Sequence, residues 1–415
     1  MNNELILKGE RAKKAARALA TLRSDVKNNA LFAIADGLVA GTDYLLQNNQ
    51  IDMKNAEEKG MPEAMRDRLL LTEKRVEDMA EGIRQVAALP DPVGEVLGMT
   101  KRPNGLLIGK TRVPLGVIGI IFESRPNVTA DAAALCVKAG NAVILRGGSE
   151  AIHSNLAIAE LMRREGEKAG LPEGAIALVE DTARETAVAL MRLNGYIDVL
   201  IPRGGAGLIN AVVKNATVPV IETGTGNCHI YVEQSADLAM AKNIIINAKT
   251  SRPSVCNAAE TLLADRAIAE RFLPGALSDL AKAGVELRGC AETAAIFPAV
   301  KAATEEDWAT EYSDYILAVK VTDGIDDAIA HITQYGTKHS EAIVTTDYNK
   351  SRKFLAEVDA AAVYVNASTR FTDGYEFGFG AEIGISTQKM HARGPMGLTE
   401  LTTIKYIIYG DGQIR

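Results

Sequence analysis

Short apolar runs alternate with helical stretches over residues 116–221, and no other feature constrains the fold of this sequence as strongly. The runs are apolar at nearly every position, as is typical of parallel strands buried on both faces; they span 116–122, 142–145, 175–179, 199–201 and 218–221. The stretches between them have helical spacing of apolar residues and span 130–139, 151–169, 182–194 and 207–215. This strand–helix alternation predicts a doubly wound parallel sheet.

A second alternation begins near residue 228 and predicts a second α/β domain with a parallel sheet of its own. Its strand-like pieces are 230–232, 315–319 and 342–344. Its expected helices are 236–249, 257–270, 325–335 and 348–357. A chain of 415 residues has room for two or three domains.

Both ends of the chain predict additional structure. Residues 8–90 read mostly as helix, whereas 106–113 and the alternating tail 402–409 read as strands. We expect the tail to pair with the hairpin around 97–113 and to form a small β oligomerisation arm. The expected division is 1–96 with 115–225, then 226–390, with 97–114 and 401–415 as the arm.

Composition limits the classes of function. The formal net charge of −7 argues against a nucleic-acid binder, which would carry a basic face. No stretch approaches the length of apolar sequence that a membrane span needs, and the first eleven residues are unlike a signal peptide. The four cysteines are scattered, which favours a reducing compartment. We therefore expect a cytoplasmic protein that contacts neither nucleic acid nor membrane.

Glycine-rich turns follow two of the expected strands. Cations and small residues at the carboxyl end of a parallel strand suit an anionic ligand such as a dinucleotide phosphate. The predicted ligands are Arg146, Ser149, Arg203, Gly204, Gly205 and Gly207. Arginine and a hydroxyl would accept the 2′-phosphate of NADP, and neither turn has the spacing of a P-loop.

Cys256 is the candidate nucleophile. A thiol attacks as thiolate, which a nearby cation or a helix N-terminus favours. Arg252 lies just upstream, and we expect the run from Cys256 to Ala259 to open a helix. The alternative is a buried structural cysteine. No metal site is expected, because Cys228 and His229 are adjacent and the other histidines lack ligand spacing.

Motifs along most of the chain resemble the aldehyde dehydrogenase superfamily. They are 114–121, 139–146, Glu222-Thr223-Gly224, Cys256 and 377–384. The resemblance implies an aldehyde dehydrogenase-like α/β fold with two doubly wound domains plus the arm. The first domain would bind the dinucleotide, and the second would carry Cys256.

Four longer runs narrow the resemblance to the branch of this superfamily that reduces an acyl phosphate. They are 122–128, 222–229, 251–257 and 388–395. This branch implies reduction of L-glutamyl 5-phosphate by NADPH to L-glutamate 5-semialdehyde and phosphate, in proline biosynthesis. NADP(H) would be the cofactor, and a glutamate kinase is a possible partner.

The resemblance also implies residue roles. Cys256 would form a thioester, Asn127 would stabilise the oxyanion, and Glu311 would hold the nicotinamide ribose. Asn127 could instead be a turn former after Pro126. Glu222 matches a glutamate that activates water elsewhere in the superfamily. Because hydrolysis would waste the thioester, Glu222 is expected to orient the cofactor or to handle a proton.

Three arginines are candidates for the substrate's phosphate and carboxylate: Arg125, Arg252 and Arg393. Each could equally form a structural salt bridge. Two other functions stay open at this point: a non-phosphorylating aldehyde dehydrogenase, and a non-catalytic binding protein that kept the fold.

Overall fold

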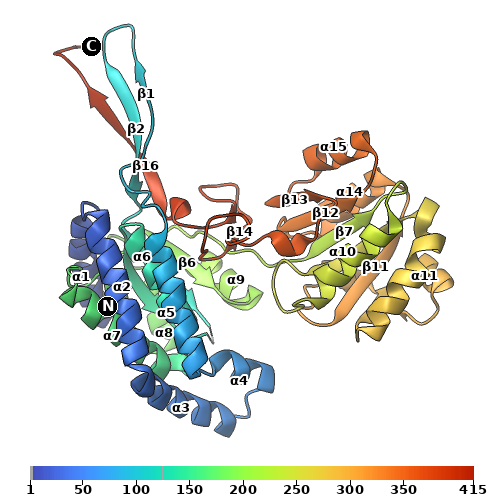
Figure 1. Ribbon diagram of the computed structural model, residues 1–415, viewed down its shortest axis with the longest axis horizontal. Helices are drawn as coiled ribbons and strands as arrows, with labels where there is room; N and C mark the ends of the chain where they lie inside the picture. The colour runs from blue at the N-terminus through green and yellow to red at the C-terminus, as the bar shows by residue number, and fades with distance from the viewer. Residues whose placement is uncertain (1–2, 124) are drawn as a thin grey trace. The chain divides into compact units, whose positions relative to one another are not determined.

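The computed structural model describes residues 3–123 and 125–415. Ser124, which belongs to the 122–128 run, lies outside the described residues. The chain forms two compact units. Unit 1 comprises 1–222, 378–384 and 396–415, and unit 2 comprises 223–377 and 385–395. Each unit carries a parallel sheet with helices packed on it, which confirms the expected α/β fold class (Figure 1).

Unit 1 is built on a four-stranded parallel sheet in the order β5-β4-β3-β6. The strands are β3 (Val117–Phe122), β4 (Ala142–Arg146), β5 (Ile176–Leu178) and β6 (Val199–Arg203). All six residues of β3 are buried, as the apolar run predicted. Burial of such a strand on both faces removes apolar area from water, at about 25 cal/mol per Å².

Helices surround this sheet in two layers. α1, α6 and α7 contact the strands, whereas α2 and α5 pack on other helices. The first five helices are α1 (Asn3–Leu19), α2 (Ser24–Ala40), α3 (Thr42–Glu58), α4 (Glu63–Leu69) and α5 (Glu73–Ala88). The helices that follow strands are α6 (Asn127–Lys138), α7 (Ile152–Lys168), α8 (Arg184–Met191) and α9 (Ala206–Asn215), with a 3₁₀ turn η1 (Ser149–Ala151) before α7.

One expected strand of unit 1 is nearly absent. Within 218–221 a single residue, Val220, forms a parallel bridge, with Leu200 of β6. Pro219 has no N–H to donate to a ladder, which limits this segment to short pairing at the edge of the sheet.

Unit 2 is built on a seven-stranded parallel sheet in the order β10-β9-β11-β8-β7-β12-β13. The strands are β7 (Cys228–Val232), β8 (Ala259–Asp265), β9 (Glu286–Gly289), β10 (Lys301–Ala302), β11 (Ile316–Thr322), β12 (Ser340–Val344) and β13 (Ala362–Val365). The helices are α10 (Leu238–Thr250), α11 (Arg266–Lys282), α12 (Ala291–Ile296), α13 (Glu305–Ala309), α14 (Ile325–Tyr335) and α15 (Tyr348–Glu357). Three shorter elements complete the unit: η2 (Thr369–Phe371), β14 (Ile385–Ser386) and β15 (Gly394–Pro395).

The helix expected over 257–270 is wrong. Its first half is β8, a strand whose seven residues are all buried between β7 and β11, and the helix begins only at Arg266. Alanine and leucine in this segment favour helix locally. Burial in the centre of a sheet overrides that preference, because the strand completes two hydrogen-bonded ladders.

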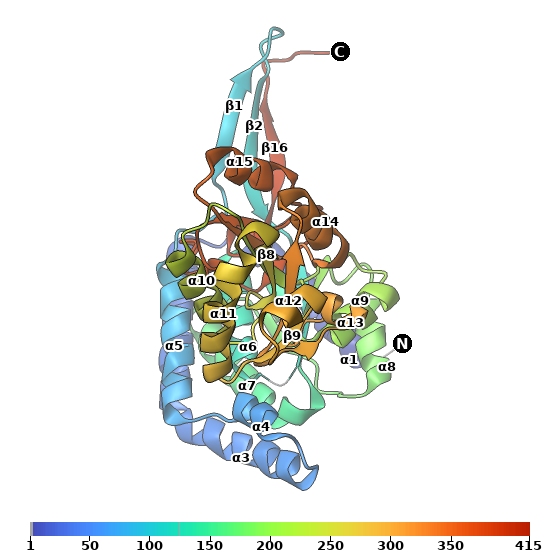
Figure 2. The same cartoon turned by 90° about the vertical axis from the view of Figure 1, so that its right-hand side faces the viewer.

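Three antiparallel strands form an arm that projects from unit 1 (Figures 1 and 2). They are β1 (Val96–Lys101), β2 (Leu107–Pro114) and β16 (Thr402–Tyr409), with β2 in the centre. β16 pairs with β2 along its whole length, from Thr402 opposite Pro114 to Tyr409 opposite Leu107. The alternating tail is therefore a strand, and its partner is the hairpin. A short 3₁₀ turn, η3 (Thr399–Leu401), precedes it.

Residues 378–384 pack in unit 1, although the sequence analysis placed them in the second domain. The Ile383 N–H donates to the Met396 carbonyl at 2.9 Å, and a Cβ at Gly380 would contact Leu89.

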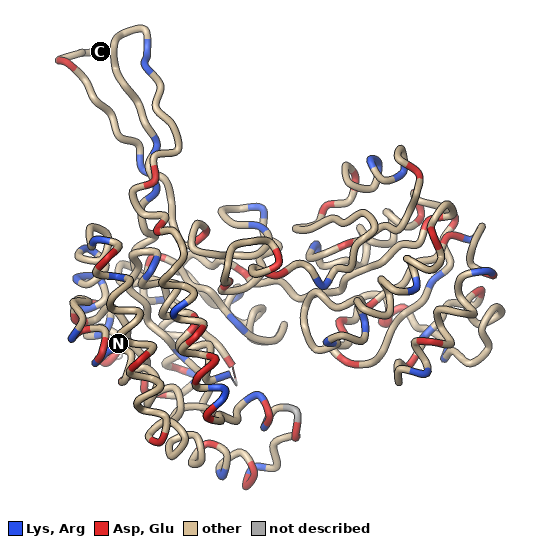
Figure 3. Tube along the Cα trace, in the orientation of Figure 1, with Lys and Arg blue, Asp and Glu red and all other residues tan. Residues whose placement is uncertain are grey.

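Basic and acidic residues are interspersed along the helices of unit 1 (Figure 3), and some of them form salt bridges such as Lys74–Asp78. No described helix has the length and apolar character that a bilayer span demands.

Candidate functional site

Cys256 lies in the turn between α10 and β8 and is partly exposed. The turn leads into a strand, so the expectation that Cys256 opens a helix is wrong. No helix dipole therefore points at this thiol through the residues that follow it, and an oxyanion would not meet a helix start at Cys256 or Asn257. Any stabilisation of the thiolate has to come from side chains and from the loop itself.

Gly226 packs directly against the backbone of Cys256. A Cβ on Gly226 would lie 1.5 Å from the Cys256 carbonyl oxygen, so only glycine fits. The Gly226 N–H donates to Oε1 of Glu311 at 2.8 Å. The run that follows Glu222 thus packs against the backbone of Cys256, the candidate nucleophile, and Glu311 fixes this contact through Gly226.

Glu311 was expected to hold the nicotinamide ribose, but one of its oxygens accepts this backbone N–H. Burial raises the pKa of the Glu311 carboxyl. A buried salt bridge lies nearby, where Lys249 Nζ approaches Glu260 Oε2 at 2.5 Å, and Lys249 also acts on Glu311 electrostatically. Burial raises the pKa of Glu260 to about 7. The Gly226–Glu311 hydrogen bond and the nearby Lys249–Glu260 salt bridge stabilise the loop that carries Cys256.

Asn257 and Arg370 hold the loop 251–258 in place; it carries the candidate nucleophile Cys256 and is called the nucleophile loop below. Asn257 Nδ2 donates to the carbonyls of Arg370 and Thr372, at 3.2 and 2.9 Å. Arg370 returns a hydrogen bond from Nη1 to Asn257 Oδ1, and its Nε donates to Ser251 Oγ at 3.1 Å. Thr369 Oγ1 donates to the Asn257 carbonyl at 2.7 Å. Arg370 was not predicted, because nothing in the local pattern of 368–371 links it to a residue 113 positions earlier.

The other three cysteines have structural surroundings. Cys136 and Cys228 are buried, and burial raises the pKa of both thiols. The Cys228 thiol donates to the Cys256 carbonyl at 3.2 Å, so it supports the loop. Cys290 caps α12, where its sulfur accepts the N–H groups of Thr293 and Val321. His339 lies beside Cys228, and burial lowers the pKa of its imidazole to about 4.

Two predicted substrate arginines belong to unit 2 and differ in their surroundings. Arg252 is exposed and makes no hydrogen bond or ion pair with any described residue. Arg393 is half-buried, and its Nη1 pairs with Asp359 Oδ1 at 2.9 Å. Arg393 Nε and Nη2 are buried without a partner among the described residues. Lys389 also pairs with Asp359, at 2.8 Å.

Arg146 and Ser149 stand at the carboxyl end of β4 in unit 1. Arg146 Nη2 donates to the Thr182 carbonyl at 2.8 Å, and burial lowers the pKa of its guanidinium. Its Nε is buried and has no partner among the described residues. Ser149 is exposed at the start of η1. Both residues lie where an anion could approach the end of the sheet.

A carboxylate occupies the second glycine-rich turn. Arg203 ends β6, and Gly204, Gly205 and Gly207 are exposed around the start of α9. The Gly205 N–H donates to Oε2 of Glu123 at 3.0 Å. Glu123 is not among the residues that the sequence analysis predicted for the site. The signal for its role was its place directly after β3, the neighbour of β6.

Asn127 is the first residue of α6 and is exposed. Its Nδ2 donates to Oδ2 of Asp131 at 2.9 Å, and burial raises the pKa of that carboxyl to about 6. Arg125 is half-buried just before this helix. Glu222, the last residue of unit 1, is half-buried as well.

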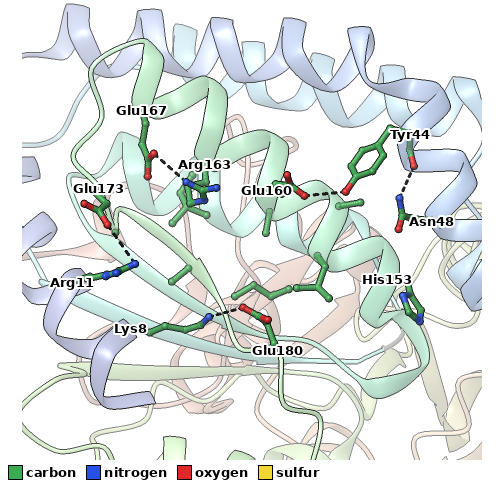
Figure 4. Close-up of a pocket in the computed structure, with 17 residues that line it drawn as sticks. Lys8, Arg11, Tyr44, Asn48, His153, Glu160, Arg163, Glu167, Glu173 and Glu180 are labelled. Atoms are coloured by element: carbon green, nitrogen blue, oxygen red, sulfur yellow. Dashed lines mark hydrogen bonds and ion pairs between the residues drawn. The ribbon is translucent and has the colours of Figure 1, made fainter. Parts of the chain in front are cut away.

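A pocket of about 680 Å³ lies elsewhere in unit 1, between α1, α3, α7 and β5 (Figure 4). None of the predicted site residues lines it. Its charged side chains pair with one another, as in Lys8–Glu180, Arg11–Glu173 and Arg163–Glu167. This pocket is therefore separate from the glycine-rich turns. Among the described residues, no group of three or more histidine, cysteine, aspartate or glutamate side chains could hold a metal ion.

Comparison with known proteins places the chain in a family. Residues 9–307 match the model of the aldehyde dehydrogenase family. A gamma-glutamyl phosphate reductase of Clostridium perfringens is 64% identical over 415 residues, which cover all of both chains. The chain belongs to the gamma-glutamyl phosphate reductase family.

Solved structures agree with this family assignment. The gamma-glutamyl phosphate reductase of Thermotoga maritima is 50% identical, covers 100% of both chains and superposes with a TM-score of 0.98. A propionaldehyde dehydrogenase of Rhodopseudomonas palustris, at 17% identity and a TM-score of 0.70, covers 97% of this chain and 96% of its own, and shares the fold alone. The resemblance predicted from the sequence motifs is thus confirmed for both the superfamily and the narrower branch.

Proposed function

We propose that this member of the gamma-glutamyl phosphate reductase family reduces L-glutamyl 5-phosphate to L-glutamate 5-semialdehyde through a thioester on Cys256, with NADPH as the hydride donor. Relatives that match it from end to end are named for this reduction, a step of proline biosynthesis. The observation that carries the thioester is the nucleophile loop. Cys256 is the partly exposed cysteine on a turn held by Gly226, Asn257 and Arg370.

An acyl phosphate is already activated for attack by a thiolate. The Cys256 sulfur forms a bond to the acyl carbon, and the bond from that carbon to the phosphate oxygen breaks. Phosphate departs with the electron pair and takes up a proton from solvent. Addition of hydride to the thioester carbonyl then expels the thiolate and leaves the aldehyde. Cations near the loop stabilise both the thiolate and the departing phosphate.

Membership of the aldehyde dehydrogenase family implies a nicotinamide cofactor, and the proposal specifies NADP(H). The residues of unit 1 fit its anionic groups: Arg146 has a buried Nε–H without a partner among the described residues, and Ser149 offers an exposed hydroxyl. A Cβ at Gly205 or Gly207 would meet no heavy atom within 4 Å, so the second turn has room at these two glycines, although the Glu123 carboxylate lies against Gly204. Arg203 and Gly204 complete this set. When bound, the cofactor supplies the hydride.

Glu311 and Glu222 have different parts in the proposal. Because Glu311 already accepts the Gly226 N–H, we assign it to positioning the loop as well as to the ribose. Glu222 orients the cofactor or moves a proton, since water activation would destroy the thioester. Asn127, held by Asp131, donates to the oxyanion. Arg125, Arg252 and Arg393 bind the anionic groups of the substrate.

The proposal also covers the oligomeric state, a partner protein and the cellular location. The arm exposes apolar side chains on its two outer strands, β1 and β16, including Met99, Ile404 and Ile408, as a surface for a second copy of the chain would. The labile acyl phosphate has to be made nearby, which favours a glutamate kinase as partner. We place the protein in the cytoplasm, where such a kinase and NADPH would meet it.

The test measures NADP⁺ reduction with glutamate 5-semialdehyde, with and without inorganic phosphate, in wild type and in Cys256→Ala. Strict dependence on phosphate, abolished in Cys256→Ala but kept in the control Cys290→Ala, is the expected result. Turnover without phosphate would instead indicate a non-phosphorylating aldehyde dehydrogenase, with Glu222 as the base that activates water.

A further inference from the structure

Arg370 reaches the nucleophile loop from a distant segment, the 3₁₀ turn η2, and is held there on one side. Its Nε donates to Ser251 Oγ at 3.1 Å, and its Nη1 donates to Asn257 Oδ1. The backbone carbonyl of Arg370 accepts from Asn257 Nδ2. Both the side chain and the backbone of this residue are thus fixed to the residues that flank Cys256.

The rest of the guanidinium remains available. An arginine carries five N–H donors, and these two bonds use two of them. Arg370 Nη2 makes no hydrogen bond to a described residue, and it is not among the buried polar atoms that lack a partner. The bonds to Ser251 and Asn257 fix the plane of the guanidinium group. The N–H groups that remain can therefore donate two parallel hydrogen bonds to an anion.

Arg252 supplies a second cation, close enough to Arg370 to repel its guanidinium. Arg252 is exposed, and no described residue pairs with it. Burial, and then repulsion from Arg252, lower the pKa of the Arg370 guanidinium, whereas Cys256 and Asp373 act on it in the opposite direction. No described carboxylate forms an ion pair with either arginine. Arg252 and Arg370 therefore repel each other, and a bound anion would offset that repulsion.

Arg393 is less suited to this role. Its guanidinium already pairs with Asp359, a carboxylate whose other partners are Lys389 and Lys338. A substrate phosphate would have to compete with that carboxylate. Arg370 faces no such competitor among the described residues.

We propose that Arg370, together with Arg252, binds the phosphate group of the acyl phosphate and makes the site specific for a phosphorylated substrate. This inference rests on the proposed function. As the thiolate attacks, the bond from acyl carbon to phosphate oxygen breaks, and negative charge grows on the departing phosphate. The two guanidinium groups stabilise that charge. In the opposite direction they hold inorganic phosphate in place to attack the thioester.

The experiment follows NADP⁺ reduction with glutamate 5-semialdehyde while inorganic phosphate is varied at constant ionic strength. Arg370→Met and Arg370→Lys are compared with wild type and with Arg266→Met. The last variant removes the same charge at the opposite end of β8, where Arg266 pairs with Asp323. For Arg370→Met we expect the KM for phosphate to rise about tenfold or more, as loss of a charge-assisted hydrogen bond implies. The KM for the semialdehyde should stay within about twofold.

Arg370→Lys keeps the positive charge but loses the paired N–H donors of the guanidinium group. Its KM for phosphate should therefore lie between the values for wild type and Arg370→Met. Arg266→Met should match wild type. If Arg370 only held the loop, its variants would lower kcat and leave the KM for phosphate unchanged, and that result would overturn the proposal.

A second measurement does not depend on turnover. Inorganic phosphate should slow alkylation of Cys256 by iodoacetamide in wild type, and Arg370→Lys should need about fivefold more phosphate for the same protection. Equal protection in both proteins would count against Arg370. Wild-type turnover that is independent of phosphate would overturn the proposed function itself, whereas phosphate-dependent wild type with unaffected Arg370 variants would overturn this inference alone.

Discussion

The nucleophile loop of unit 2 and the glycine-rich turns of unit 1 are both short connections at sheet ends, but they are built differently. The loop is held by hydrogen bonds from Asn257 and Arg370 and by contact of Gly226 with the Cys256 carbonyl. The turn after β4 is crowded, because a Cβ at Gly147 or Gly148 would overlap the side chain of Asn155 or Glu150. The turn after β6 holds the Glu123 carboxylate and has room only at Gly205 and Gly207. In the proposed mechanism Cys256 forms a covalent bond and needs exact placement, whereas the turn after β6 has room at Gly205 and Gly207 for a cofactor to enter and leave.

The largest effect that would test this comparison is expected for Gly226→Ala. The added Cβ would overlap the Cys256 carbonyl oxygen, so the loop has to shift. We expect kcat to fall by about 100-fold, as a displacement of about 1 Å can cause. The free energy of unfolding should fall by about 2–4 kcal/mol. Steady-state kinetics and denaturant unfolding measure the two effects.

Gly275→Ala is the matched control, because it lies inside α11 and a Cβ there would meet no atom within 4 Å. It should keep activity and stabilise the helix by about 0.5–1 kcal/mol. Wild-type activity in Gly226→Ala would show that the loop is not rigid, and the contrast between the two regions would be lost.

A smaller effect, of opposite sign, is expected for Glu123→Gln in unit 1. The substitution keeps an acceptor for the Gly205 N–H and removes a negative charge from the turn. A cofactor phosphate would then meet less repulsion, so the KM for NADPH should fall about threefold, with stability within about 0.5 kcal/mol. Glu185→Gln, an exposed change on α8, serves as the charge-matched control. A KM that rises instead would mean that Glu123 organises the turn for the cofactor.

The smallest effect is expected for Asp359→Asn, which removes the partner of Arg393 in unit 2. Hydrogen bonds from Lys389 and Arg393 hold the pKa of Asp359 at about 2, below its ordinary value of 3.8. A carboxyl with a lowered folded-state pKa contributes stability above its unfolded pKa and loses it as pH falls through the folded value. Because the group is half exposed, the loss at neutral pH should stay below about 1 kcal/mol.

The difference in unfolding free energy between wild type and Asp359→Asn should therefore shrink from pH 5 toward about pH 2, as thermal or denaturant unfolding would show. The same variant frees Arg393. A lower KM for substrate in Asp359→Asn would support Arg393 as a substrate ligand, and an unchanged KM would mark it as structural.

Strands that are buried on both faces could be predicted from the sequence, since their apolar runs have no other explanation. β3 and β4 are examples, and the alternating tail that became β16 is another. β8 could not be predicted, because Ala258 to Ala264 favour helix locally and only the neighbouring strands make them a strand. Cys256 could be proposed as the nucleophile because its surrounding motif is recognisable, and the structure adds that it is partly exposed on a turn.

The partners of Cys256 could not be predicted in the same way. Arg370 is joined to Asn257 across 113 positions of sequence, and Glu123 meets Gly205 only because β3 and β6 are neighbours. Contacts of this kind depend on strand order, which a single sequence does not contain. The glycines in the sequence predicted the turns after β4 and β6. The requirement for glycine at position 226 could not be predicted, because it comes from contact with the Cys256 backbone.

The order of strands in the arm has a consequence for synthesis on the ribosome. β2 lies in the centre of the arm sheet, yet its second partner β16 is encoded far downstream, with Arg112 and Thr402 separated by 290 positions. At about 5–20 residues per second, translation needs on the order of tens of seconds to supply that partner. During this interval one edge of the hairpin is open to pairing with other nascent chains. Slow translation or truncation before β16 should therefore favour aggregation over native assembly.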